Sequence, residues 1–259
     1  MKADNVVLTK RLKMIADMIT MGNRLVDVGC DHGYLPLYVL QQGISPSAIA
    51  MDINKGPLDA ARKNVEEAGL SESIQLRLSD GLKEYQPGEG DTLVCAGMGG
   101  PLMEKILTES FDKVIGLKEL ILQPQSEISQ FRQFLRRNGL RIVEEDAVEE
   151  DGKFYTAMKV IMGAGLEGEQ SSGEFMNARE SNLEEEAGQQ KLFDTYGEYL
   201  LKSKHPVLKE YLDLQLNNLK QIEGSLELQD SEKALSRLPE IREEIALVES
   251  ALSYIAFDV

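Results

Sequence analysis

The sequence predicts an α/β protein: a doubly wound, mostly parallel seven-stranded sheet followed by a C-terminal α-helical coiled-coil hairpin. Three observations predict this fold class. Strand-like runs alternate with helical patterns through the first 138 residues, which is typical of a parallel sheet. Two strand-like runs then follow without a helix between them, as in an antiparallel hairpin. In the last third, apolar residues recur at spacings of four and three, the periodicity of packed helices.

The elements of the alternating part are expected in the following order. A helix over 8–21 opens the chain, and Gly22 is its expected C-terminal stop. Strands are expected over 24–28, 48–51, 74–78, 92–96 and 120–122. Helices are expected between them over 34–42, 57–68, 101–109 and 127–138.

A hairpin closes the expected sheet, and the composition then changes. The hairpin strands are expected over 140–148 and 154–162, joined by the acidic turn 149–153. Residues 163–173 are rich in Gly, Glu and Ser, which indicates a boundary between domains. We therefore expect a first domain over 1–162 and a second over 163–259.

The second domain is expected to be helical. One helix is expected over about 174–199, and two apolar stripes, 208–226 and 238–255, flank a polar turn at 229–231. Two functions stay open for this tail: a lever that grips a large substrate, or a dimerising or stabilising arm. A monomer is expected, and a homodimer through the coiled coil is the alternative.

The composition is that of a globular protein, with 42% hydrophobic and 28% charged residues. No apolar run approaches the roughly 18 residues of a membrane span, and no secretory signal opens the chain. The two cysteines, Cys30 and Cys95, indicate reduced thiols and a cytoplasmic location. Neither has the spacing of a metal site, so no metal is expected.

The net charge of −16 disfavours non-specific binding of nucleic acid, because such binding relies on phosphate neutralisation. An RNA partner would need a local basic surface. Two groups of basic residues are candidates: Lys10, Arg11 and Lys13, and Arg132, Arg136, Arg137 and Arg141. By charge alone, a solvated helix face is the favoured interpretation of both groups.

A glycine-framed turn after the first expected strand is the main functional signal. The turn runs from Gly29 to Gly33 and leads directly into an expected helix, so that backbone can approach a nucleotide-like ligand. Acids or glycines also follow the next three strands. Asp52 is suited to ribose hydroxyls, Asp80 and Gly81 to an adenine edge, and the glycines of 97–101 expose backbone at the same rim.

Two kinds of cofactor fit such a site, and the charge of the turn distinguishes them. A dinucleotide brings a pyrophosphate close to the turn, where the negative charge of Asp31 is unfavourable. S-adenosylmethionine has no phosphate and carries a sulfonium and an amino group, which suit acids at Asp27 and Asp31. The terminal hairpin also fits a methyltransferase sheet. A methyltransferase is therefore favoured.

Residues 8–162 resemble the class I S-adenosylmethionine-dependent methyltransferases, and more closely the bacterial tRNA adenine-22 N1-methyltransferases of the TrmK type. The resemblance rests on the segments 26–36, 50–54, 96–100, 122–125 and 152–155, and the tail is similar to that family's coiled-coil domain. It implies a Rossmann-like fold and methyl transfer to N1 of adenine 22 in the D-loop region of tRNA. The cofactor contacts that we assign on this basis are Asp27, Gly29, Cys30, Gly33, Asp52, Ile53, Asp80, Gly81 and Gly97.

The substrate side departs from the wider nucleobase methyltransferases, because no aromatic residue follows the fourth strand. Tyr34, Phe154 and Tyr155 are the candidates for stacking on the target base. The remaining residues that we assign to substrate binding are Lys10, Arg11, Met98, Gly99, Gly100 and Arg136. The adenine must leave its stack to reach the site.

Adenine N1 has a free lone pair at neutral pH, so positioning is expected to supply most of the acceleration. The catalytic candidates are Asp31 and His32. The Asp31 carboxylate would stabilise the charge that develops on the base, or would accept the N6 proton. The alternatives are that Asp31 binds the methionine amino group or caps the helix at Tyr34, and that His32 shapes the turn.

Rival functions stay open at this point. One is a methyltransferase that acts on a small molecule or a protein, and the other is a non-catalytic RNA-binding scaffold with a vestigial cofactor fold.

Overall fold

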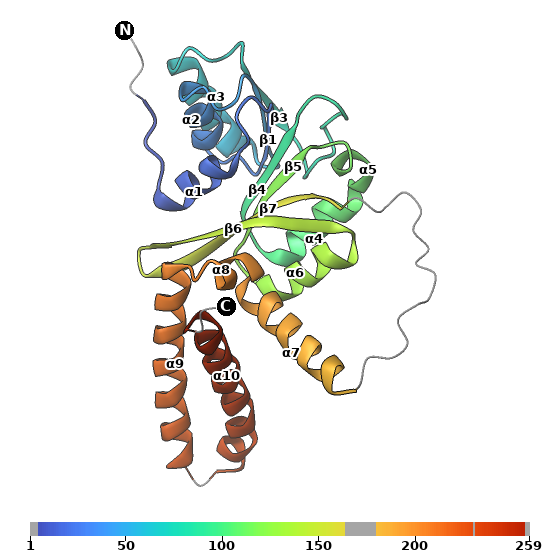
Figure 1. Cartoon of the computed structure of the whole chain (residues 1–259). Coiled ribbons are helices and arrows are strands. Elements are labelled where there is room, and N and C mark those ends of the chain that lie inside the picture. Colours follow the sequence, from blue (N-terminus) through green and yellow to red (C-terminus); the bar gives the residue numbers. More distant parts are fainter. Residues whose placement is uncertain (1–4, 164–179, 230, 257–259) are drawn as a thin grey trace. The chain divides into compact units, whose positions relative to one another are not determined.

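The computed structural model describes residues 5–163, 180–229 and 231–256. The chain divides into two compact units, Met1–Gln170 and Ser171–Val259, which are described separately (Figure 1). The domain boundary expected between 162 and 163 stays a prediction, because residues 164–179 lie outside the described part of the chain. The start of the helix expected over 174–199 also lies there.

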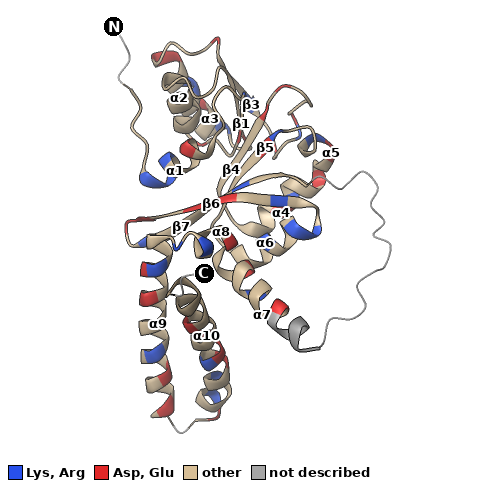
Figure 2. Ribbon diagram, viewed as in Figure 1, with Lys and Arg blue, Asp and Glu red and all other residues tan. Residues whose placement is uncertain are grey.

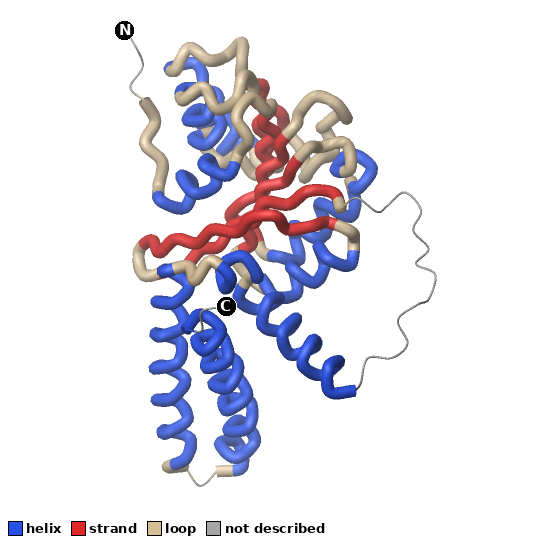
Figure 3. Tube along the Cα trace, viewed as in Figure 1, coloured by secondary structure: helices blue, strands red, loops and turns tan. Residues whose placement is uncertain are grey.

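The first unit contains a seven-stranded sheet with the order β3-β2-β1-β4-β5-β7-β6 (Figure 3). The strands are β1 (Leu25–Val28), β2 (Ala48–Asp52), β3 (Ile74–Leu78), β4 (Thr92–Met98), β5 (Glu119–Pro124), β6 (Leu140–Glu150) and β7 (Lys153–Met162). Strands β1 to β5 pair in parallel, and β7 is antiparallel to both of its neighbours. The predicted sheet is therefore confirmed. Its strand order reverses between β1 and β4, where the carboxyl ends of the strands form the usual ligand crevice of such folds.

Helices cover both faces of this sheet. They are α1 (Lys10–Met18), α2 (Tyr34–Gln41), α3 (Lys55–Glu67), α4 (Gly100–Glu109), α5 (Phe111–Val114) and α6 (Ile128–Arg137). Successive residues of a strand point to opposite faces, so each strand serves two hydrophobic clusters. Leu25 and Val94 pack with α1, α2 and α3, whereas Val26 and Leu93 pack with α4, α5 and α6.

Helix α1 is shorter than the helix expected over 8–21. It begins after Thr9, whose Oγ1 accepts a hydrogen bond from the backbone N–H of Leu12 (3.3 Å). It ends at Met18, because Ile19 adopts extended backbone and buries its side chain. Gly22 is therefore not the stop of this helix and lies instead in the turn before β1. The single-turn helix α5 was not predicted, since one turn carries no periodicity.

The β6–β7 hairpin is longer than expected. Its strands reach Glu150 and Lys153, so the turn contains only Asp151 and Gly152. Their φ angles of +52° and +74° are those of a type I′ turn, which matches the twist of the paired strands.

The second unit consists of the helices α7 (Glu180–Tyr196), α8 (Glu198–Lys202), α9 (Pro206–Glu227) and α10 (Glu232–Ala256). The antiparallel pair α9 and α10 confirms the predicted helical hairpin, with Leu212 and Leu219 of α9 and Ile241 and Val248 of α10 among its buried residues. The helix expected up to residue 199 breaks at Gly197, whose φ is +93°.

Acidic and basic residues are interspersed along α9 and α10 (Figure 2). Arg242 of α10 reaches Glu223 (2.8 Å) and Glu227 (2.7 Å) of α9, and Lys220 reaches Glu249 (2.9 Å). These basic side chains are thus already paired with acids. Within the described residues, no helix combines the length and apolar character that crossing a membrane requires.

Candidate active site

The turn between β1 and α2 has the backbone that its glycines predict. Gly29, Asp31 and Gly33 all have positive φ angles, of +77°, +50° and +74°. A Cβ on Gly29 would lie 2.3 Å from Cε of Met98, so the end of that flexible side chain would have to shift, and the positive φ is the stronger reason for glycine at this position. Gly33 is the N-cap residue of α2 and packs against Ala61, where a Cβ would lie 3.2 Å from that of Ala61.

A cavity of about 280 Å³ opens at the carboxyl ends of β1 and β4. It brings together side chains and backbone from β1, the following turn, the start of α2, the end of β4, and α1. The predicted site residues that line it are Arg11, Asp27, Gly29, Cys30, Asp31, His32, Tyr34 and Gly97. The sequence thus predicted most of the lining, although it did not predict that Arg11 joins the cofactor turn in one cavity.

Asp27 is the most unusual group of this cavity. Its side chain is 4% exposed, and burial together with the charge of Asp52 raises the pKa of its carboxyl to about 7. Within the described residues, the Asp27 carboxyl forms no hydrogen bond or ion pair. Asp52, by contrast, accepts hydrogen bonds from the backbone N–H groups of Asn54 (2.8 Å) and Asp31 (3.3 Å). A buried, unpaired carboxyl is costly unless a cation joins it, so this cavity fits a cationic ligand such as S-adenosylmethionine.

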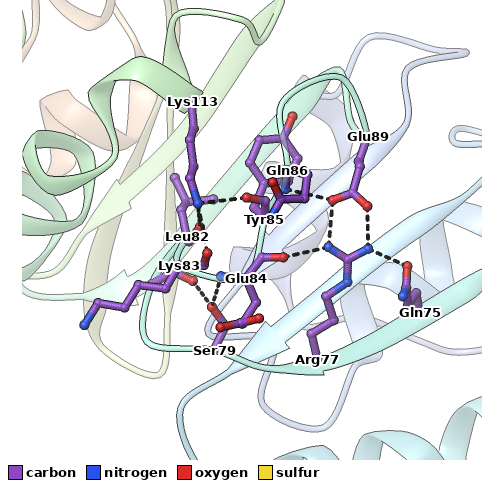
Figure 4. A network of polar contacts seen from close by, with 11 residues as sticks. Gln75, Arg77, Ser79, Leu82, Lys83, Glu84, Tyr85, Gln86, Glu89 and Lys113 are labelled. Atoms are coloured by element: carbon purple, nitrogen blue, oxygen red, sulfur yellow. Dashed lines mark hydrogen bonds and ion pairs between the residues drawn. The ribbon is translucent and has the colours of Figure 1, made fainter.

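Asp80 and Gly81 lie in a loop after β3 that is held by many polar contacts (Figure 4). The Lys113 ammonium donates to the carbonyls of Leu82, Lys83 and Tyr85, each at 2.9 Å. Ser79 Oγ accepts from the N–H of Glu84 (3.1 Å) and donates to the carbonyl of Gly81 (2.8 Å). This network of hydrogen bonds holds the loop at the carboxyl end of β3.

The outer part of the expected cofactor site lies outside the cavity. The carboxyl of Asp80 is exposed and paired with Lys83, which lowers the pKa of Asp80. Ile53 is 60% exposed beside Asp52, at the end of β2. The assignments of Asp52, Ile53, Asp80 and Gly81 to cofactor binding stay predictions, and so do those of the cavity residues.

A buried amide that the sequence analysis did not assign organises one wall of the cavity. Gln123 in β5 is fully buried, and its Oε1 accepts from a guanidinium nitrogen of Arg11 (3.0 Å) and from the N–H of Gly97 (3.1 Å). Arg11 also lies over the ring of Tyr155, 5.7 Å from its centroid. The signal for Gln123 was present in the sequence, because an amide interrupts the apolar run of β5.

Three predicted substrate-binding residues around the end of β4, Met98, Gly99 and Gly100, pack closely against neighbouring parts of the protein. The Met98 side chain packs in the core, with Sδ 3.6 Å from Sγ of Cys95 and Cε against Gly29. A Cβ on Gly100 would lie 2.7 Å from the Ser126 carbonyl oxygen, and one on Gly99 would lie 2.9 Å from Ser126 Oγ. Packing of α4 against the loop before α6 therefore demands small residues at positions 99 and 100, and the assignment of Met98, Gly99 and Gly100 to substrate binding stays a prediction.

Of the three candidate stacking residues, only Tyr34 lines the cavity. Its ring stacks on that of His32 with centroids 5.9 Å apart, and Tyr34 remains 46% exposed. Tyr155 lies behind Arg11, and Phe154 precedes it in β7, so the two rings point to opposite faces of the strand. Phe154 therefore does not reach the cavity that Tyr34 borders.

The basic residues do not form one surface. Lys10 is exposed near the cavity, at the start of α1, and donates to the Glu149 carbonyl (3.2 Å). Arg136 is at the end of α6, which runs back from the carboxyl edge of the sheet to the opposite edge. Arg132 is buried and paired with Glu145 (2.9 Å). The buried ion pair removes Arg132 from the candidate basic surface, and the assignment of Arg136 to substrate binding stays a prediction.

Within the described ranges, no three His, Cys, Asp or Glu side chains are grouped as a metal site would require.

Comparisons with known proteins agree with this geometry. The family model of the methyltransferase domain matches residues 8–158. The tRNA (adenine(22)-N(1))-methyltransferase of Bacillus subtilis is 38% identical over 156 residues, which are 60% of this chain and 66% of that protein, or just under two thirds of its length.

Solved structures match over nearly the whole chain. The crystal structure of the B. subtilis m1A22 tRNA methyltransferase TrmK has a TM-score of 0.74 at 28% identity and covers 96% of this chain and 100% of its own. A Streptococcus pneumoniae protein solved in complex with S-adenosyl-L-methionine has a TM-score of 0.76 at 30% identity and covers 95% and 100%. The chain belongs to the class I S-adenosylmethionine-dependent methyltransferases, in the TrmK family of tRNA (adenine-22-N1)-methyltransferases.

Proposed function

We propose that this protein methylates N1 of adenine 22 in tRNA and takes the methyl group from S-adenosylmethionine. The observation that carries the proposal is the buried carboxyl of Asp27, which faces the cavity without a partner among the described residues. A cationic cofactor supplies that partner. The choice of tRNA and of adenine 22 rests on the activity named for the B. subtilis relative.

S-adenosylmethionine, when bound, supplies an electrophilic methyl group on its sulfonium. The residues of the chain then orient the base and exclude water, because adenine N1 needs no base before attack. Tyr34 and His32 form a stacked pair at the mouth of the cavity, on which an unstacked base can rest. The target adenine is proposed to enter against this pair.

Asp31 is proposed to stabilise the positive charge that develops on the adenine. Its side chain is 70% exposed at the cavity, and its Oδ1 lies 3.4 Å from Nε2 of His32. The alternative that Asp31 caps α2 is wrong, because Gly33 occupies that position and no side chain caps the helix. The Asp31 carboxylate is thus available to a bound base or to the amino group of the cofactor.

The proposal is tested by incorporation of label from S-adenosylmethionine into unmodified tRNA transcripts, followed by nucleoside analysis. We expect N1-methyladenosine, and none in a matched transcript that has guanosine at position 22. Cofactor binding without incorporation into any tRNA would contradict the substrate and leave the cofactor assignment intact. Incorporation into both transcripts would contradict adenine 22 as the methylated nucleotide.

The remaining expectations belong to the same proposal: a tRNA partner, a cytoplasmic location and a monomer. A homodimer would use exposed apolar side chains of α9, such as Leu214 and Ile222. Light scattering of the protein in solution separates the two states.

A further inference from the structure

Gln125 is the first residue after β5, and it lines the cavity beside Gly97. Its backbone N–H donates to the Met98 carbonyl (2.8 Å), and the carbonyl of the next residue, Ser126, accepts from the N–H of Gly100 (3.1 Å). The backbone on both sides of the Gln125 side chain is therefore fixed to the segment 98–100. A side chain on a backbone held in this way can bind a ligand in one orientation.

Gly97 leaves open space beside Gln125. In the ladder between β4 and β5, the residues before and after Gly97 are paired and Gly97 is not, so it is the extra residue of a β-bulge. A Cβ on Gly97 would lie 3.8 Å from Nε2 of Gln125. Because Gly97 has no side chain, the space in front of its backbone is open to a ligand, and the Gln125 amide borders this space.

The side-chain amide of Gln125 is available to such a ligand. The side chain is exposed, and among the residues that the structure describes its amide has no hydrogen-bond partner. Gln123 differs, because its Oε1 already accepts from Arg11 and from the N–H of Gly97. A carboxamide has an acceptor oxygen and a donor nitrogen side by side. The Gln125 amide therefore fits a ligand that presents a donor next to an acceptor.

Adenine presents this pair of groups on one edge. Its N6 amino group donates and its N7 accepts, and a glutamine amide binds both in the pairing by which proteins recognise adenine in the major groove of DNA. That contact leaves N1 without a hydrogen bond, as methylation requires, because the N1 lone pair must point at the methyl group. Guanine has O6 in place of the amino group, so the Gln125 oxygen would meet a second acceptor.

We propose that Gln125 determines the specificity for adenine: its Oε1 accepts from the N6 amino group of the target base, and its Nε2 donates to N7. The ring of Tyr34, which lines the same cavity, then supports the face of that base. The hydrogen bond from N6 strengthens as positive charge develops on the ring, so it also contributes to the rate. The inference deepens the proposed function and rests on it.

Methylation of modified tRNA transcripts tests this contact. The transcripts carry at position 22 adenosine, 7-deazaadenosine, which lacks N7, or purine riboside, which lacks the amino group. We expect the preference in kcat/KM for adenosine over each analogue to be roughly 5- to 50-fold smaller in Gln125→Ala than in the wild type. The intrinsic reactivity of each base is the same with both proteins and cancels in this comparison. The affinity for S-adenosylmethionine, measured by calorimetry without tRNA, should not change.

Two further variants sharpen the test. Gln125→Glu keeps an acceptor for N6 but has no donor for N7, so it should retain the preference over purine riboside and lose the preference over 7-deazaadenosine. Gln130→Ala removes an exposed glutamine of α6 that does not line the cavity. It is the matched control and should keep both preferences.

Equal preferences in the wild type and in Gln125→Ala would overturn the proposal. A loss of cofactor affinity in Gln125→Ala would also overturn it, since the residue would then only shape the cavity. A wild-type protein that methylates none of the transcripts would contradict the proposed function itself. A wild-type protein that methylates adenosine, with preferences that Gln125→Ala leaves unchanged, would contradict only the role of Gln125.

Discussion

Asp27 links the stability of the free protein to cofactor binding. Its pKa is raised from 3.8 to about 7, so the ionised form is disfavoured in the folded protein. The folded state therefore loses stability as pH rises from about 4 to about 7, and the ionised carboxylate that results is the form that a cation prefers. The ionised form of Asp27, which binds a cation best, is thus the form that destabilises the free folded protein.

We expect the affinity for S-adenosylmethionine to rise between pH 6 and pH 8, measured by calorimetry. In Asp27→Asn the rise should disappear and the affinity should fall, while the free protein at pH 8 should gain up to about 4 kcal/mol of unfolding free energy. Asp59→Asn, on the exposed surface of α3, is the control and should leave both quantities unchanged. A wild-type affinity that does not vary with pH would contradict the role of Asp27.

Asp31 is expected to act on the chemical step more than on binding. Asp31→Asn should lower kcat about 10- to 100-fold, because a carboxylate near the developing charge contributes electrostatic stabilisation. The affinity for S-adenosylmethionine should change little, which distinguishes this role from binding of the amino group. An Asp31→Ala protein that binds the cofactor normally and methylates at full rate would contradict this catalytic role of Asp31.

At the scale of elements, the β1–α2 turn depends on the close approach of β4. Gly29→Ala adds backbone strain at a φ of +77° and requires the end of the flexible Met98 side chain to shift. We expect a loss of roughly 2–3 kcal/mol in unfolding free energy, measured by denaturant titration. Gly43→Ala has a φ of +68° but no atom near its Cβ, so it should lose only about 1 kcal/mol. Equal losses of unfolding free energy in the two variants would show that the contact with Met98 does not destabilise Gly29→Ala.

The loop after β3 is expected to depend on Lys113, whose ammonium joins three carbonyls of that loop. Lys113→Met should cost about 1–3 kcal/mol of unfolding free energy and should increase hydrogen exchange at residues 82–86. Lys105→Met removes a surface ion pair with Glu109 in α4 and is the control, with an expected loss below about 1 kcal/mol. Unchanged exchange in the loop would contradict the structural role of Lys113.

For the whole molecule, the position of the basic residues predicts where tRNA binds. Lys10 is next to the cavity, whereas Arg137 lies at the far end of α6. Lys10→Glu should therefore weaken tRNA binding and lower the slope of log affinity against log salt by roughly one, as for the loss of one phosphate contact. Arg137→Glu should leave the slope unchanged. A lower slope in Arg137→Glu and an unchanged slope in Lys10→Glu would indicate that tRNA binds at α6 instead.

Local sequence determined the fold class and the cofactor turn, because hydrophobic periodicity and glycine conformation act over a few residues. Alternating strands and helices predicted the sheet, and the glycines around Asp31 predicted a turn with positive φ angles. Local periodicity did not predict the C-terminal end of α1, because the helix ends where Ile19 adopts extended backbone and becomes buried.

Only the tertiary structure decided which distant side chains meet. Arg11 and Gln123 are 112 residues apart in the sequence. They become neighbours because α1 packs on the face of the sheet to which Ile121 and Gln123 of β5 contribute their side chains. The glycine-rich sequence around Met98 and Gly100 predicts an exposed loop, yet Met98 packs against the core and Gly100 lies close to the backbone of Ser126. Periodicity records which face of an element is apolar, whereas strand order and packing set the partners of each buried polar group. That is why the cavity, the raised pKa of Asp27 and the contact between Arg11 and Gln123 followed only from the folded chain.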